Sequence, residues 1–184
     1  ADIAKADAIL LVGANPAVTM PPAMQWFDAG RAAGATHIVV DPRRSATAAG
    51  SSVHLAPLPG TDLALANGLL HLAIRDDLID HGYIHSRTKD FASVKAGVAA
   101  YWPDRVERIT GIDARDLREA AQVLGEAETA MVITARGADG GAERHHGSGV
   151  ATGQCRRQRS LVGRGLVAHA EHRRVSAFRQ VDDQ

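Results

Sequence analysis

The stretch Ala8–Pro16, AILLVGANP, decides the fold, because a continuous apolar run ends there in a short polar turn. A second stretch repeats the pattern at His37–Arg44, HIVVDPRR, and a third, Pro57–Leu65, PLPGTDLAL, is a turn that opens a helix. Apolar runs of this length that lack alternation are typical of strands covered on both faces. In a parallel sheet, all three turns would meet at one edge.

Strand and helix patterns alternate along the chain. The β-branched run Ile38–Val40 and the short Val53–Leu55 are predicted strands, as is the apolar Ala130–Ile133, which we expect to be buried. A helix is predicted to begin at Pro21 and Pro22 and to close at Gly34, because Met24, Trp26, Phe27, Ala32 and Ala33 follow at roughly helical spacing. A second helix is predicted from Thr61, its natural cap, to Ile74. Helical segments are predicted at 77–80, 93–101 and 104–109, and a further helix is capped by Asp113. The fold class is therefore α/β, a parallel, Rossmann-like sheet with flanking helices.

Length and composition bound the functional class. The 184 residues suffice for one domain with its own core, and a formal net charge of zero gives no field that favours nucleic acid or an anionic membrane. The longest apolar run, Ala8–Val12, is far shorter than the ~20 residues that span a bilayer, so no membrane segment is expected. The single cysteine, Cys155, excludes an internal disulfide framework and suits a reducing compartment, which we take to be the cytoplasm.

The pattern changes beyond residue 137. Residues 138–184 hold eight Arg, no Lys and four of the nine His, without sustained apolar periodicity. We therefore divide the chain into an α/β nucleotide-binding domain at 1–137 and an irregular, Arg-rich tail at 138–184. The tail is either a basic, flexible segment or, as we favour, a stretch translated out of frame from a GC-rich gene. RNA binding by the tail is disfavoured, because Phe178 is its one aromatic residue.

Histidine and serine chemistry is not indicated. His81 and His85 are four apart, but Gly82 interrupts a helix and the Glu of a metalloprotease motif is missing, so we expect exposed loop residues and no zinc. His169, His172 and Cys155 match no structural zinc spacing either. No serine stands in the Gly-x-Ser-x-Gly context of a hydrolase.

The three turns each offer ligand-binding groups. Gly13 lets the backbone approach a ligand, and Asn15 offers a donor and an acceptor, although the dinucleotide pattern G-x-G-x-x-G is absent. Asp41 suits ribose hydroxyls or a guanine edge, and the arginines beside it suit phosphate. Asp62 is placed to cap a helix or to accept from the N1 and N2 donors of guanine. Taken alone, the first turn is better explained as a ligand-free connection and Asp62 as a cap, and the second turn is explained equally well as a solvated turn. Only their combination favours a nucleotide.

The combination resembles the molybdopterin oxidoreductase family, whose pattern is a strand ending in G-[AS]-N, a second ending in D-P-R, and P-G-T-D opening a helix. All three are matched in order, over residues 1 to about 137. Within the family, the sequence of residues 15–22, 62–71 and 101–111 is most similar to the assimilatory nitrate reductase branch, and the formate dehydrogenase branch is nearly as similar.

The resemblance implies binding of the guanine dinucleotide part of a bis-molybdopterin guanine dinucleotide cofactor. It implies that phosphates and ribose lie against the first turn, the nucleoside against the second and guanine against the third; the residues concerned are Gly13, Ala14, Asn15, Asp41, Pro42, Arg43, Gly60, Thr61 and Asp62. The turn at 135–137 leads in this family to a loop near the pterin, which is replaced here, so Arg136 and Gly137 are not assigned.

The resemblance further implies a larger parent enzyme that reduces nitrate to nitrite at molybdenum. A four-cysteine [4Fe-4S] site and the residue that ligates molybdenum would lie upstream, and a second nucleotide-binding half downstream. We therefore expect this chain to be a fragment, inactive alone, whose partners are the cofactor, the rest of the parent polypeptide and an unidentified electron donor. A formate dehydrogenase fragment and a non-catalytic nucleotide-binding module are the alternatives.

Overall fold

A four-stranded parallel sheet organises the computed structural model, which describes residues 2–135. The strands are β1 (Ala8–Val12), β2 (Thr36–Val40), β3 (Val53–Leu55) and β4 (Ala130–Thr134), in the order β3-β2-β1-β4. Leu10 of β1 is in register with Ile38 of β2 and Val132 of β4. Because all strands run the same way, their carboxyl ends share one side of the sheet, which we call the carboxyl edge.

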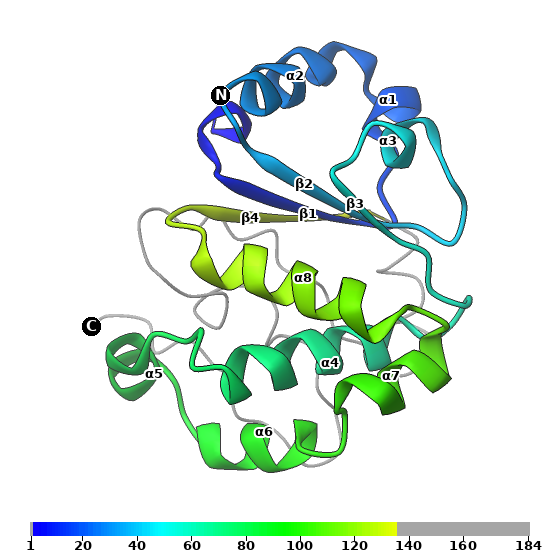
Figure 1. Cartoon of the computed structure of the whole chain (residues 1–184). Coiled ribbons are helices and arrows are strands. Elements are labelled where there is room, and N and C mark those ends of the chain that lie inside the picture. Colours follow the sequence, from blue (N-terminus) through cyan, green and yellow to red (C-terminus); the bar gives the residue numbers. More distant parts are fainter. Residues whose placement is uncertain (1, 136–184) are drawn as a thin grey trace.

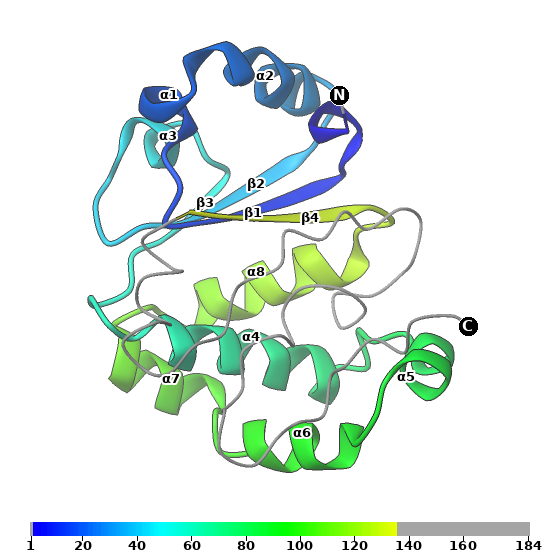
Figure 2. The same ribbon diagram turned by 180° about the vertical axis from the view of Figure 1, so that it is seen from behind.

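Helices cover both faces of the sheet (Figure 1), as a parallel sheet requires. The upper layer in Figure 1 holds α1 (Pro16–Thr19), α2 (Met24–Ala32) and α3 (Ala46–Ala49), with the short 3-10 helices at Ile3–Lys5 and Pro21–Ala23. Below the sheet lie α4 (Asp62–Arg75), α7 (Pro103–Thr110) and α8 (Ala114–Glu126), with α5 (His81–Arg87) at the far end from α7 and α6 (Phe91–Val98) lowest in the view. The reverse view in Figure 2 shows the same layers. The predicted α/β fold is confirmed.

The core follows from the two-residue period of the strands. In β1, Leu10 belongs to the cluster shared with α4, α7 and α8, whereas Ile9 and Leu11 belong to the cluster that contains Phe27 of α2. The continuous apolar run of β1 is thus explained, because each face of the strand meets its own layer of helices. A third, smaller cluster joins α4 to α5 and α6 through Leu70, Ile84, Val94 and Val98.

Several helix boundaries differ from the sequence prediction. Residues 77–80 are not helical, and Asp77, in the turn that follows α4, has a left-handed φ of 58°. The histidines expected in a loop lie in α5, which begins where the Asp80 carboxylate accepts a hydrogen bond from the Tyr83 amide at 2.8 Å. This cap and the burial of Ile84 offset the low helix propensity of Gly82.

Three further expectations need adjustment. Strand β4 is half-buried along its whole length instead of buried, because it pairs with β1 on one side only within the described residues. The apolar periodicity at 93–101 corresponds to α6, which ends at Val98, before Tyr101. The helix predicted from Pro21 to Gly34 consists of a 3-10 turn at Pro21–Ala23 followed by α2, in which Phe27 and Gly30 are buried and Trp26 is exposed.

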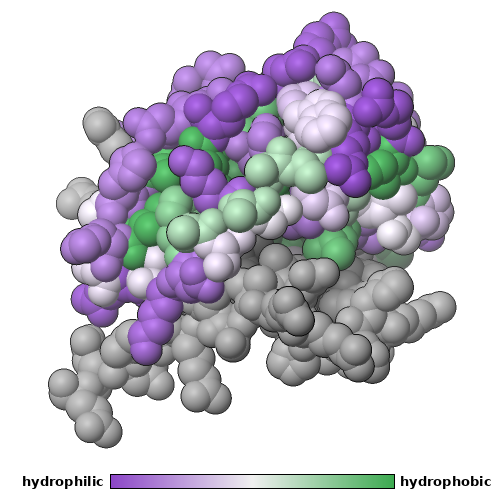
Figure 3. All heavy atoms as spheres, turned by 90° about the horizontal axis from the view of Figure 1, so that it is seen from below, coloured by the Kyte–Doolittle hydropathy of each residue, from purple (hydrophilic) through white to green (hydrophobic). Residues whose placement is uncertain are grey.

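The surface of the lower layer is mixed. Hydrophilic residues are interspersed with smaller hydrophobic areas on the face seen from below in Figure 3. No helix in the described residues is long and apolar enough to cross a membrane. The tail predicted at 138–184 lies outside the described residues.

Candidate functional site

The first two predicted turns are joined at the carboxyl edge. Gly13 follows β1 with a φ of 61°, a conformation that glycine adopts without strain, and its amide donates to the Val40 carbonyl at the end of β2, at 2.8 Å. Gly13 is exposed, whereas Ala14 is buried in the cluster that contains Ile9, Leu11 and Phe27. The first turn therefore presents backbone at Gly13 and uses Ala14 as an anchor.

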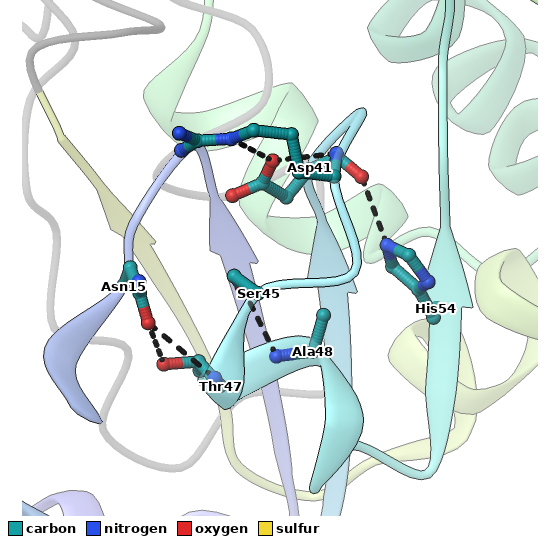
Figure 4. Close-up of polar contacts among 7 residues, drawn as sticks. Asn15, Asp41, Ser45, Thr47, Ala48 and His54 are labelled. Carbon is teal, nitrogen blue, oxygen red and sulfur yellow. Dashed lines mark hydrogen bonds and ion pairs between the residues drawn. The ribbon is translucent and has the colours of Figure 1, made fainter. Parts of the chain in front are cut away.

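Asn15 is held by a residue that the sequence analysis did not single out. Its Oδ1 accepts from the Thr47 hydroxyl at 2.7 Å and from the Thr47 amide at 3.4 Å (Figure 4). Thr47 lies in α3, whose N-cap Ser45 accepts from the Ala48 amide at 3.3 Å. Ser45 before a short helix is a signal that the sequence carries, but the Asn15–Thr47 contact spans 32 residues and has no local signature.

Asp41 is buried, with only 3% of its surface exposed. Its Oδ1 accepts from the Arg43 amide at 2.8 Å and from Arg43 Nε at 3.4 Å, which folds the turn back on itself. The Arg43 side chain is 79% exposed and remains available to a ligand. The carboxylate was predicted to suit ribose hydroxyls or a guanine edge, and in the structure Oδ2 is the oxygen that no described residue hydrogen-bonds.

His54 supports the same turn from β3. Its Nε2 is hydrogen-bonded to the Asp41 carbonyl oxygen at 2.8 Å, as Figure 4 shows, and the Asp41 amide donates to the Leu55 carbonyl at 3.1 Å. With Nε2 donating, the backbone of Asp41 is fixed by two bonds to one strand. The sequence analysis missed His54, because a half-buried histidine in a short strand carries no motif.

The third turn differs from the other two in its place. Gly60 has a φ of 86°, and Thr61 occupies the N-cap position of α4. The expectation that Thr61 caps the helix is wrong, because its side chain makes no cap hydrogen bond and instead donates to the Leu58 carbonyl at 2.7 Å. Its backbone angles, φ −107° and ψ 12°, lie outside the extended region that a capping residue usually adopts.

Asp62 is exposed in the first turn of α4, where a carboxylate is favoured by the helix dipole. No hydrogen bond joins it to Asn15 or Asp41 within the described residues. The amino end of α4 nevertheless points to the same side of the molecule as the carboxyl ends of the strands, in Figures 1 and 2. The turns that carry Asn15 and Asp41 are thus joined to each other, and α4 begins with Asp62 on the same side of the molecule, in the lower layer.

Histidines elsewhere are engaged in local contacts. His81 Nε2 lies 2.6 Å from Asp77 Oδ1 on the exposed surface of α5. Among residues 2–135, no group of three or more His, Cys, Asp or Glu side chains could hold a metal ion. The buried His37 belongs to the amino end of β2, and burial together with Arg31 lowers its pKa below the ordinary 6.5.

The groups at the carboxyl edge fit a nucleotide. The side-chain amide of Asn15 and the exposed guanidinium of Arg43 are donors suited to phosphate oxygens, and the exposed backbone of Gly13, without a side chain, leaves room for a ligand to approach. Asp41 Oδ2 and the Asp62 carboxylate are acceptors suited to hydroxyl or base N–H groups. Donors and acceptors together match a nucleotide better than a simple anion.

Comparison with known proteins agrees with this geometry. The chain matches the family model of molybdopterin oxidoreductase over residues 1–179. It is 36% identical over 136 residues, 74% of the chain, to the F420-dependent formate dehydrogenase subunit alpha of Methanocaldococcus jannaschii and to the assimilatory nitrate reductase catalytic subunit of Bacillus subtilis. Formate dehydrogenase H of Escherichia coli is 33% identical over the same length.

A solved structure has the same fold. The acetylene hydratase of Pelobacter acetylenicus superimposes with a TM-score of 0.68 and 28% identity, covering 72% of this chain and 18% of that chain. The chain spans about a fifth of the length of the curated relatives, 20% and 19% for the first two. The parallel sheet with its polar carboxyl edge, the family match and these relatives show that the chain belongs to the molybdopterin oxidoreductase family, which implies a molybdenum–pterin cofactor.

Proposed function

We propose that the carboxyl edge binds the guanine dinucleotide part of a bis-molybdopterin guanine dinucleotide cofactor, within a parent enzyme that reduces nitrate. The observation that carries this proposal is the joining of the first two turns through the Gly13–Val40 and Asn15–Thr47 hydrogen bonds, with the start of α4 at Asp62 on the same side of the molecule. When bound, the cofactor supplies a molybdenum centre for oxygen-atom transfer. This chain contributes binding and placement.

Each turn has its own part in binding. Asn15 and Arg43 hold the phosphates, which approach the chain closely at Gly13, and Asp41 Oδ2 accepts from a ribose hydroxyl. Asp62 accepts from N1–H and N2–H of guanine, a donor pair that adenine lacks. Ala14 and Pro42 shape the two turns, and Gly60 and Thr61 bring the chain to the start of α4.

Nitrate is the proposed substrate because the sequence of residues 15–22, 62–71 and 101–111 is most similar to the assimilatory nitrate reductase branch. The nitrate reductase of Shewanella frigidimarina is 43% identical over 94 residues, which supports the same choice. The formate dehydrogenase relative at 36% identity favours the alternative, formate oxidation. The proposal further places a [4Fe-4S] cluster upstream of this segment, an electron donor beside the parent enzyme and the whole in the cytoplasm.

A comparison of the affinities for guanosine diphosphate and adenosine diphosphate tests whether the three turns bind a guanine nucleotide. We expect calorimetric titration of the full 184-residue chain to show tighter binding of guanosine diphosphate. Asp62→Ala should weaken that binding tenfold or more, since a hydrogen bond to a charged group contributes about 1.5–3 kcal/mol. Asp104→Ala is the matched control, because Asp104 is likewise exposed in the first turn of a lower-layer helix, α7.

Equal affinity for the two nucleotides, or an Asp62→Ala variant that binds like the unaltered chain, would refute guanine recognition. The substrate is decided on the parent enzyme. Nitrate-dependent oxidation of a reduced viologen supports the proposed branch, and formate-dependent dye reduction without nitrate turnover replaces it with the alternative.

A further inference from the structure

Thr47 connects the two turns that follow β1 and β2. It is 8% exposed, and it lies in α3, directly beneath Asn15 in the view of Figure 4. Its hydroxyl contacts both Asn15 and Ala17, so a single side chain of the second turn ties down two residues of the first. Contact between α1 and α3 accompanies these bonds, which fixes the relative position of the turns.

The direction of each hydrogen bond is set by groups that can only donate. The Ala17 amide donates to Thr47 Oγ1 at 3.2 Å, so the hydroxyl proton is free to be donated to Asn15 at 2.7 Å. The Thr47 amide points at the same Asn15 atom from 3.4 Å. Two donors converge on that atom, which must therefore be the carbonyl oxygen of the side-chain amide.

The consequence is that Asn15 has one kind of group left for a ligand. Its Oδ1 is occupied by two donors from Thr47, and no described residue accepts a hydrogen bond from its Nδ2. The Nδ2 group carries two N–H donors. Asn15 is thereby converted from an ambivalent amide to a pure donor.

We infer that Thr47 is a positioning residue that holds Asn15 with its Nδ2 presented to an acceptor, a phosphate or ribose oxygen of the nucleotide. The ligand half of this inference rests on the proposed function; the orientation of Asn15 does not. In this arrangement the two layers of helices bind different parts of the nucleotide. Asn15 supplies donors to oxygen atoms, and the donor edge of guanine is left to the carboxylate of Asp62.

Three variants of the full 184-residue chain test the inference, with guanosine diphosphate as the probe. Thr47→Val removes the hydroxyl and keeps the shape, and Thr47→Ser restores the hydroxyl. Thr129→Val is the matched control, because the Thr129 hydroxyl accepts from the Asp7 amide at 3.2 Å and donates to Asp7 Oδ2 at 2.7 Å, at the opposite edge of the sheet. These two hydrogen bonds have the same lengths as those between the Thr47 hydroxyl and Ala17 and Asn15.

We expect Thr47→Val to lower the affinity for guanosine diphosphate about fivefold to tenfold, the effect of one mispositioned hydrogen bond. Thr47→Ser should recover most of the lost affinity. Thr129→Val should lower the unfolding temperature without changing the affinity. If Thr47→Val weakens binding no more than Thr129→Val does, the positioning role is overturned.

A second measurement needs no ligand. Nitrogen-15 relaxation of the Asn15 side-chain amide should show an ordered group in the unaltered chain and in Thr47→Ser, and rotamer averaging in Thr47→Val. An equally ordered amide in Thr47→Val overturns the inference even if nucleotide binds. Absence of nucleotide binding by the unaltered chain, with the relaxation result as expected, instead refutes the proposed function alone.

Asn15→Asp tests the donor assignment. The substitution keeps an acceptor for Thr47 but replaces the two N–H donors with an anionic oxygen. We expect the unfolding temperature to be retained and guanosine diphosphate to bind at least tenfold more weakly. Unchanged affinity would show that Asn15 does not act through its Nδ2.

Discussion

His37 is a buried histidine whose Nε2 has no hydrogen-bond partner within the described residues. Its ring packs edge-on against Phe27, with centroids 5.8 Å apart. Burial lowers its pKa below 6.5, and nearby Arg31 lowers it further, while Asp28 opposes the change. The folded chain therefore favours the neutral ring, and the unfolded chain takes up a proton as the pH falls below 6.5.

This imbalance predicts a pH dependence of stability. The contribution of His37 is complete above pH 6.5 and is lost as the pH falls below that value toward the lowered pKa of the folded state. We expect the decrease in unfolding free energy between pH 7.5 and pH 5 to be smaller in His37→Leu than in the unaltered chain, measured by urea denaturation. The exposed His85→Leu variant is the control, and parallel slopes for the two variants would contradict the assignment.

At the scale of elements, close packing of α4 depends on Gly68. A Cβ added there would lie 2.7 Å from Cγ2 and 3.1 Å from Cγ1 of Val106 in α7, and 3.4 Å from Leu117 Cδ2 in α8. We expect Gly68→Ala to destabilise the chain by about 1–3 kcal/mol through overpacking, although alanine is the better helix former by about 1 kcal/mol.

Gly97 provides the comparison within one experiment. It lies in α6, and an added Cβ would meet no atom within 4 Å. Gly97→Ala should therefore stabilise the chain by about 0.5–1 kcal/mol in thermal or urea unfolding. Opposite signs for the two substitutions are the expected result; a stabilising Gly68→Ala would rule out the tight contact between α4 and α7.

At the scale of the whole molecule, β1 is the centre of the fold. It pairs with β2 on one side and β4 on the other, and its residues enter the clusters on both faces. The cluster of Leu70, Ile84, Val94 and Val98 is small and lies at the periphery. Local opening of α5 and α6 should therefore cost less free energy than exposure of β1.

Native-state hydrogen exchange measures this difference. We expect the amides of β1 to exchange only through global unfolding, and those of α5 and α6 to exchange faster. Val94→Ala should accelerate exchange in α5 and α6 alone, whereas Leu10→Ala, at a cost of about 2–5 kcal/mol, should accelerate it everywhere. Uniform acceleration by Val94→Ala would mean that the cluster of Leu70, Ile84, Val94 and Val98 unfolds together with the sheet.

Much of the fold could be predicted because its signals are local. The apolar run of β1, the β-branched residues of β2 and Asp113, which caps α8 by accepting from the Arg115 amide at 2.7 Å, act within a few residues. Thr61 shows the limit of such signals, because its hydroxyl has two nearby choices and takes the Leu58 carbonyl. The prediction of a helix at 77–80 and a loop at His81 and His85 was wrong because the Asp80 cap and the burial of Ile84 place the helix after Asp80, despite Gly82.

The sequence by itself determined the parallel sheet and the order in which the three polar turns follow its strands, since strand period, proline and glycine act on their immediate neighbours. Only the tertiary structure decided what each turn presents. Thr47, 32 residues away, occupies Oδ1 of Asn15, the Arg43 amide occupies one oxygen of the buried Asp41, and α4 begins with Asp62 on the same side of the molecule in the lower layer. The reason is that a polar side chain has several hydrogen-bonding groups, and the groups left for a ligand are those that distant parts of the chain do not use.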